Sequence, residues 1–323
     1  MEDEARRRRR DEARRRVYRR RRLVAAGIAG IVVLLLVAGG MLAFGGDGGG
    51  DGEPDARAEP RPASLPRGGR TILPDQRVVA YYGAPQDDEL GILGIGSPRL
   101  AARRLERQAK PFGRPGRPVL PAFELIAAIV TSEPGQGGDH SMRQDDSTIR
   151  RYLRVARAHR MLLLLDIQPG YAPFLQEAKA LERWLKEPDV GLALDPEWSM
   201  KPPLLPAQEI GSTDAATVNE VSRYLSDLVR RNDLPQKLLV VHRFTSDMIE
   251  NEDDLERDPG VALIVNVDGF GDQPNKISKY REFTRDLRRR YNGFKLFYHE
   301  DENLMKPHQV LRLSPAPDLV VYE

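Results

Sequence analysis

Two carboxylates stand one residue apart in the stretch LALDPEWSM, residues 192–200, where an apolar run meets Asp195, Glu197 and Trp198. In an extended strand, side chains at positions i and i+2 point to the same face. Paired acids of this kind suit glycoside hydrolysis, because one carboxyl donates a proton to the leaving oxygen while an ionised partner stabilises or attacks the anomeric carbon. The ring of Trp198 offers a flat apolar surface on which a sugar can stack. What the pair can do depends on the element that carries it.

Eight short apolar runs recur along the chain, and residues 190–195 form the fourth. Most are continuously apolar, which is typical of strands covered by helices. The runs are 78–83, 125–131, 161–167, 190–195, 237–244, 262–270, 294–300 and 319–323, and the amphipathic stretches between them are 97–110, 145–160, 171–187, 213–232 and 275–291. This alternation predicts an α/β fold, a (β/α)8 TIM-like barrel over residues 77–323, close to the usual ~250 residues of that fold.

Two connections, 246–257 and 301–313, have room only for short helices, and no helix follows the last run. We expect the segment before the first strand to cover that gap. An open doubly wound sheet is the alternative architecture. The glycines of residues 83–96 lack the G-x-G-x-x-G spacing of a dinucleotide site, however, so no nucleotide cofactor is predicted.

In such a barrel the C-terminal ends of the strands converge on one pit. The strand ends here are rich in acids with aromatic residues among them. The predicted catalytic residues are Glu197, Asp195, Asp166 and Glu300, and the predicted substrate contacts are Tyr81, Tyr82, Trp198, His242, Asp268, His299 and Tyr322. Each of them alone has a structural alternative. Asp166 fits an Asx turn before Pro169 and Gly170, and His242 fits a buried hydrogen-bond donor.

Other chemistries lack their signatures. The chain has no cysteine, which excludes disulfides, thiol catalysis and Cys-ligated zinc. His242, Asp268, His299 and Asp301 are possible ligand types, but no H-E-x-x-H or H-x-H spacing accompanies them, and we predict no metal and no other cofactor. A metal-dependent deacetylase is therefore a distant third function, and a serine hydrolase lacks the G-x-S-x-G motif.

The stretch LALDPEW resembles the fourth-strand D-x-E signature of barrel glycosidases, such as the family-25 lysozymes and, more loosely, the family-18 chitinase-like enzymes. The resemblance implies that Glu197 is the acid and Asp195 its partner. The chain departs from the lysozyme pattern at the first strand, where VVAYYGAP has no aspartate, and from the longer chitinase pattern at residues 190–194. Its overall organisation is similar to membrane-anchored, glycosidase-like barrel domains of bacterial envelopes.

The N-terminal part has a different composition. Residues 1–22 hold twelve arginines and five acids, a net charge of +7, which leaves −5 for the remainder of a chain whose total is +2. Residues 23–44 are uncharged and span ~33 Å as a helix, enough to cross a bilayer. The positive-inside rule then places the basic tail in the cytoplasm and the domain outside the cell membrane. Residues 45–76, rich in Gly and Pro, predict a flexible linker.

Two functions follow from these patterns. The first is a membrane-tethered, extracytoplasmic glycoside hydrolase that acts on peptidoglycan or an exported polysaccharide. The second is a glycan-binding or scaffold barrel without catalysis. A cleaved signal peptide is the alternative to the anchor. Nucleic acid is not a predicted partner, because the basic charge is confined to one tail that membrane topology explains, and the sequence leaves the sugar, the linkage and the oligomeric state open.

Overall fold

A computed structural model describes residues 63–135, 137–206, 208–285 and 290–323. The predicted basic tail, the predicted membrane span at 23–44 and most of the predicted linker lie outside this range. Within the described part of the chain, none of the helices combines the length and the apolar character that crossing a bilayer requires.

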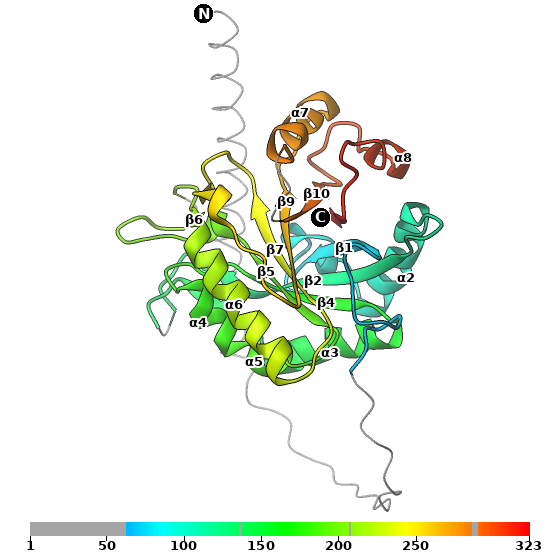
Figure 1. Cartoon of the computed structure of the whole chain (residues 1–323). Coiled ribbons are helices and arrows are strands. Elements are labelled where there is room, and N and C mark those ends of the chain that lie inside the picture. Colours follow the sequence, from blue (N-terminus) through cyan, green and yellow to red (C-terminus); the bar gives the residue numbers. More distant parts are fainter. Residues whose placement is uncertain (1–62, 136, 207, 286–289) are drawn as a thin grey trace, which may run out of the picture.

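Eight parallel strands form a closed barrel at the centre of the domain (Figure 1). Its closure is complete because the first strand pairs with both the second and the last. In barrel order the strands are β1 (Arg77–Gly83), β2 (Val119–Val130), β4 (Leu162–Ile167), β5 (Val190–Leu194), β7 (Lys237–Arg243), β9 (Val261–Val267), β10 (Tyr291–Leu296) and β11 (Leu319–Tyr322). The prediction of a TIM-like barrel is confirmed, and the largest shift is in β2, which begins six residues before the expected start at 125.

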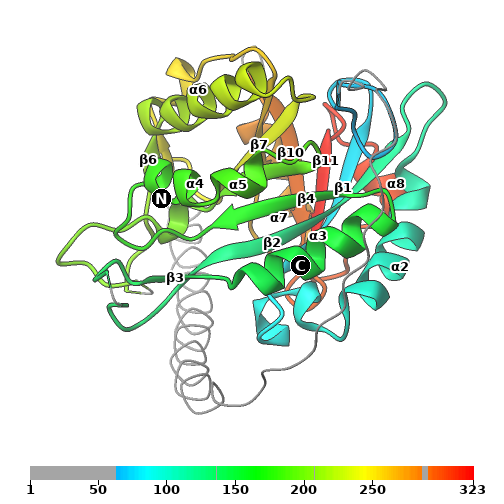
Figure 2. The same cartoon turned by 90° about the horizontal axis from the view of Figure 1, so that it is seen from below.

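Helices lie around the outside of the barrel (Figures 1 and 2). They are α2 (Pro98–Ala109), α3 (Asp146–Ala158), α4 (Phe174–Ala180), α5 (Glu182–Leu185), α6 (Ala215–Arg231), α7 (Gln273–Phe283) and α8 (Pro307–Val310). Side chains of Ser97, Asp214 and Asp272 cap α2, α6 and α7 by accepting hydrogen bonds from backbone N–H groups of the first turn. The stretch 171–187, predicted as one helix, divides into α4 and α5 at Leu181.

Short elements complete the connections. The 3-10 helices are η1 (Asp88–Leu90), η2 (Ile92–Gly94), η3 (Lys110–Phe112), η4 (Pro196–Trp198) and η5 (Glu252–Asp254); β3 (Ser141–Arg143) extends β2 in antiparallel fashion, and β6 (Thr213–Asp214) pairs with β8 (Ile249–Glu250). The connections at 246–257 and 301–313 hold only short helices, η5 and α8, in agreement with the sequence.

Alternation along the strands, interrupted in β2 by an irregularity between Ile126 and Ala128, sorts the side chains into two cores. On β1, Val78, Ala80 and Tyr82 belong to the cluster inside the barrel, whereas Val79 and Tyr81 pack against the surrounding helices. Apart from the irregularity in β2, the other strands follow the same period of two, because successive side chains of a strand point to opposite faces. This alternation decides which strand-end residues can reach a common site.

Residues 63–76 lie under the barrel rather than alongside β11. Leu65, Ile72 and Leu73 are buried in the inner cluster, and the backbone N–H groups of Ile72 and Leu73 donate to Oε1 of Gln236 at 2.7 and 2.9 Å. The guanidinium of Arg70 binds Asp233 at 2.7 Å. The expected boundary at residue 77 therefore falls within the packed region, and these residues close the N-terminal end of the barrel.

Candidate functional site

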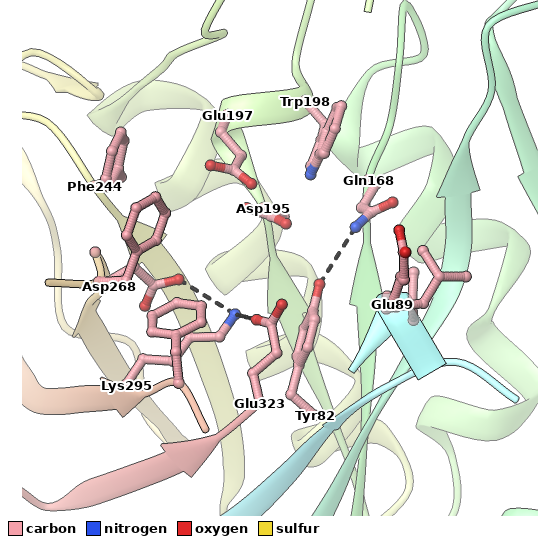
Figure 3. Close-up of a pocket in the computed structure, with 15 residues that line it drawn as sticks. Tyr82, Glu89, Gln168, Asp195, Glu197, Trp198, Phe244, Asp268, Lys295 and Glu323 are labelled. Atoms are coloured by element: carbon pink, nitrogen blue, oxygen red, sulfur yellow. Dashed lines mark hydrogen bonds and ion pairs between the residues drawn. The ribbon is translucent and has the colours of Figure 1, made fainter. Parts of the chain in front are cut away.

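A pocket opens at the C-terminal ends of the strands (Figure 3). Its cavity volume is about 120 Å³, and every barrel strand except β2 contributes a polar or aromatic wall residue at or just beyond its end. The acidic lining residues are Glu89, Asp195, Glu197, Asp268 and Glu323, the aromatic ones are Tyr82, Trp198, Phe244, Phe270 and Phe297, and the remaining ones are Leu90, Ile126, Gln168, Gly269 and Lys295. Acids and flat rings thus face one space.

The end of β5 presents the two carboxylates noted in the sequence. Asp195 stands two residues after Ala193, whose side chain points into the barrel, and so lies on the same face of the strand. Its backbone N–H still donates to the carbonyl oxygen of Ile167 at 3.0 Å. Pro196 then starts η4, which turns Glu197 and Trp198 over the pocket. The backbone N–H of Gly211 donates to the carbonyl oxygen of Glu197 at 2.7 Å, so the following loop fixes this turn.

The two carboxyls differ in proton affinity. Burial raises the pKa of Glu197 from 4.5 to about 8, with the ammonium of Lys295 opposing the shift. Burial raises the pKa of Asp195 only to about 6, because His242 and Lys295 counteract it. At neutral pH Glu197 therefore keeps its proton while most of Asp195 is ionised. Carboxyls whose environments separate their pKa values in this way mark acid and base roles.

Lys295 organises the floor of the pocket. Its ammonium lies 2.8 Å from Oε2 of Glu323, 3.4 Å from Oδ2 of Asp268 and 3.7 Å from the centre of the Tyr82 ring (Figure 3). Burial opposes its charge, but the carboxylates of Glu323 and Asp268 raise the pKa of Lys295 well above its ordinary value. The side chain is therefore an ammonium ion at neutral pH, which excludes a Schiff-base role for the amine in this state.

A buried charge network continues below the pocket. Nδ1 of His242 lies 2.9 Å from Oδ2 of Asp268, and Nε2 lies 2.8 Å from Oε1 of Glu124. Burial disfavours the charged ring, but Asp268 and Glu124 raise the pKa of His242 well above its ordinary value. Burial raises the pKa of Asp166, and the neighbouring Asp195 adds to the shift. The Tyr82 hydroxyl donates to Oδ2 of Asp166 at 3.1 Å.

Glu124, Asp166 and His242 also form a group with metal-ligand chemistry, since one ligand atom of each lies within 4.8 Å of the others. Carboxylates and imidazole suit several divalent ions. Both nitrogens of the His242 ring already lie at hydrogen-bonding distance from carboxylates, so an ion bound by this ring would have to replace one of these hydrogen bonds.

No protein-family model matches this chain, and neither does any curated protein. A barrel of this architecture hosts many chemistries. Any assignment of function therefore depends on the geometry of the pocket.

The structure brings most of the predicted site residues together. Asp195, Glu197, Tyr82, Trp198 and Asp268 line the pocket, and Asp166 and His242 lie directly beneath it. Their catalytic and binding roles stay predictions.

Four predicted residues lie elsewhere. Tyr81 and Tyr322 have the opposite parity and meet outside the barrel, with ring centres 6.4 Å apart. Because β10 ends at Leu296, His299 and Glu300 fall in the turn beyond the strand, and neither lines the pocket; His299 lines a shallow outer depression with Tyr81 and Tyr298. The expectation that these four side chains share the pit with Glu197 is corrected accordingly.

The sequence analysis missed five polar residues of the site: Glu89, Glu124, Gln168, Lys295 and Glu323. Glu124 and Lys295 are charged residues inside otherwise apolar strands, at inward positions, and Gln168 follows β4 and donates to the Tyr82 hydroxyl at 3.3 Å. Charged residues within an apolar strand are the signal that would have found Glu124 and Lys295, because a buried charge requires a partner.

Proposed function

We propose that the domain is a glycoside hydrolase in which Glu197 is the general acid and Asp195 the ionised partner. The observation that carries this proposal is the separation of their pKa values, about 8 and about 6, in one aromatic-walled pocket. A carboxyl that keeps its proton at pH 7 can donate it to a glycosidic oxygen. An adjacent carboxylate can stabilise the positive charge that develops at the anomeric carbon.

Asp195 is the best available partner for that role. Asp268 is bound to His242 and Lys295, and Glu323 to Lys295, so both are neutralised by buried cations. Asp195 lines the pocket with only 4% of its surface exposed, and its carboxylate forms no hydrogen bond with a described residue. Trp198 and the phenylalanine rings supply apolar faces that exclude water and orient a sugar.

A glycan-binding barrel without catalysis is the second candidate. The observation that favours it is the ion pairing of Asp268 and Glu323 with Lys295, which leaves few carboxylates to act on a substrate. The first strand supports this alternative as well, since it presents Tyr82 where the lysozyme-like pattern has an aspartate.

Hydrolysis distinguishes the two candidates. The full-length protein is incubated with peptidoglycan and with neutral and amino-sugar polysaccharides, and new reducing ends are counted. We expect turnover that falls at least about a hundredfold in Glu197→Gln, because a general acid contributes roughly that factor or more. Glu220→Gln, on the exposed face of α6, is the matched control. Saturable glycan binding with no turnover would favour the binding protein, and turnover unchanged in Glu197→Gln would remove the proposed acid.

We also propose that residues 23–44 anchor the chain as a single span, with the N-terminus in the cytoplasm and the barrel outside. The support is the uncharged stretch and the arginine-rich tail before it. Protease treatment of intact cells tests the topology: the barrel should be digested from outside, whereas a tag at residue 1 should be protected until the membrane is opened.

A further inference from the structure

The pocket has a strong excess of acidic groups. Five of its lining residues carry carboxyls, whereas Lys295 is the single basic one among the described residues that line it. Two of these carboxyls, Asp268 and Glu323, are balanced by the Lys295 ammonium, and His242 also binds Asp268. Asp195, Glu197 and Glu89 also line the pocket (Figure 3). The charge of Lys295 acts to lower the pKa of Asp195 and Glu197, but Lys295 forms no ion pair with Asp195. A ligand that fills the pocket meets these acidic groups.

Asp195 is the central one of these acidic groups. Only 4% of the surface of Asp195 is exposed, and the residue lines the pocket. No described residue donates a hydrogen bond to its carboxylate. Buried charges in proteins are normally paired or hydrogen-bonded, because an isolated buried carboxylate is costly. His242 and Lys295 act on Asp195 through their charges, and because Asp195 lines the pocket, a cationic group of a bound ligand can donate a hydrogen bond to it directly.

We propose that the ligand is an amino sugar with a free amino group, that is, a 2-amino-2-deoxy glycan whose nitrogen is not acetylated, with its ammonium bound to Asp195. This inference rests on the proposed glycosidase function and names its substrate class. In such a sugar the amino group is on the carbon next to the anomeric carbon. A carboxylate placed to serve the anomeric carbon is thus also within reach of the ammonium.

The walls of the pocket fit the same ligand. Aromatic rings attract both the C–H faces of sugars and nearby ammonium groups, and Trp198, Phe244 and Phe270 line the pocket together. N-acetylation removes the charge from the nitrogen and replaces it with a neutral amide. A uronate adds a carboxylate to a pocket that already has an excess of them, so anionic glycans should be excluded.

Binding measurements test the substrate class. The catalytically impaired Glu197→Gln full-length protein is titrated calorimetrically with short oligomers of glucosamine and of galactosamine, each beside its N-acetylated counterpart, and with oligogalacturonate. At least one amino oligomer should bind about tenfold or more tightly than its acetylated counterpart, and the uronate should not bind. Asp195→Asn in the same background should remove the preference for the amine, and added Glu220→Gln should leave it unchanged.

The outcomes separate this inference from the proposed function. Equal or tighter binding of the acetylated oligomers, or no binding of either amino oligomer, overturns the amino-sugar assignment. If the wild-type protein then cleaves a neutral glycan, the glycosidase proposal stands without it. If the amino oligomer binds through Asp195 and is not cleaved by the wild-type protein, the ligand class stands and the hydrolytic function fails.

Discussion

Replacing Glu197 with glutamine should stabilise the fold, and the gain should increase with pH. A carboxyl whose pKa is raised from 4.5 in the unfolded chain to about 8 in the folded one binds its proton more tightly in the folded state. Between these two pH values the folded protein holds a proton that the unfolded chain has lost, so stability decreases as pH rises. At ~1.36 kcal/mol for each tenfold change in proton affinity, the maximum loss is about 5 kcal/mol.

Because Glu197 is partly exposed and interacts with other charges in the pocket, we expect about 2–3 kcal/mol of this to be observed. Glutamine has the same shape and cannot ionise, so the unfolding free energy of Glu197→Gln should not decrease in this way as pH rises. The assay is denaturant unfolding of both proteins at pH 5 and pH 8, with Glu220→Gln as the control for an exposed carboxyl. A stability difference between wild type and Glu197→Gln that is the same at both pH values would refute the raised pKa and, with it, the role of Glu197 as a neutral acid.

Three further predictions concern the same site. If the domain is a hydrolase, its rate should be bell-shaped in pH, falling below about 6 as Asp195 gains a proton and above about 8 as Glu197 loses one, as measured from initial rates. Lys295→Met should lower the unfolding free energy by about 3–5 kcal/mol in denaturant titrations, because it leaves the buried Asp268 and Glu323 without their cation. Gly293→Ala should lower the unfolding free energy by about 1–3 kcal/mol in the same assay, since its Cβ would clash with Oδ1 of Asn266, and an unfolding free energy equal to that of the wild type would contradict that contact.

Much of the fold is predictable from the sequence because most strands are largely apolar on both faces. A strand that packs inward against other strands and outward against helices reads as an uninterrupted apolar run, and eight such runs identify the barrel. The segment 63–76 was harder to predict. Its three buried apolar residues are scattered among Gly, Pro and Arg, and a composition of this kind resembles a linker until its packing under the barrel is known.

The position of part of the site was predictable from the strand ends. Asp195 and Asp268 follow immediately after β5 and β9, and both line the pocket, although the run predicted for β9 extended three residues further, to 270. On β10 the apolar run continues to Tyr298, beyond the last paired residue Leu296, and the expected site moved with it to His299 and Glu300. Lys295 would have been selected instead if the alternation of inward-pointing and outward-pointing side chains had been followed along β10. Which of the two sets points inward is fixed by the pairing register with the neighbouring strands, and that register cannot be read from one strand alone.

The closure of the barrel floor by residues 63–76 also gives the domain a direction. The chain enters beneath the N-terminal ends of the strands, where Arg70 and Gln236 hold it, and the pocket opens at the opposite end. Residues 63–76 and the mouth of the pocket therefore lie at opposite ends of the barrel, and the segment through which the chain enters the domain covers none of the residues that line the pocket.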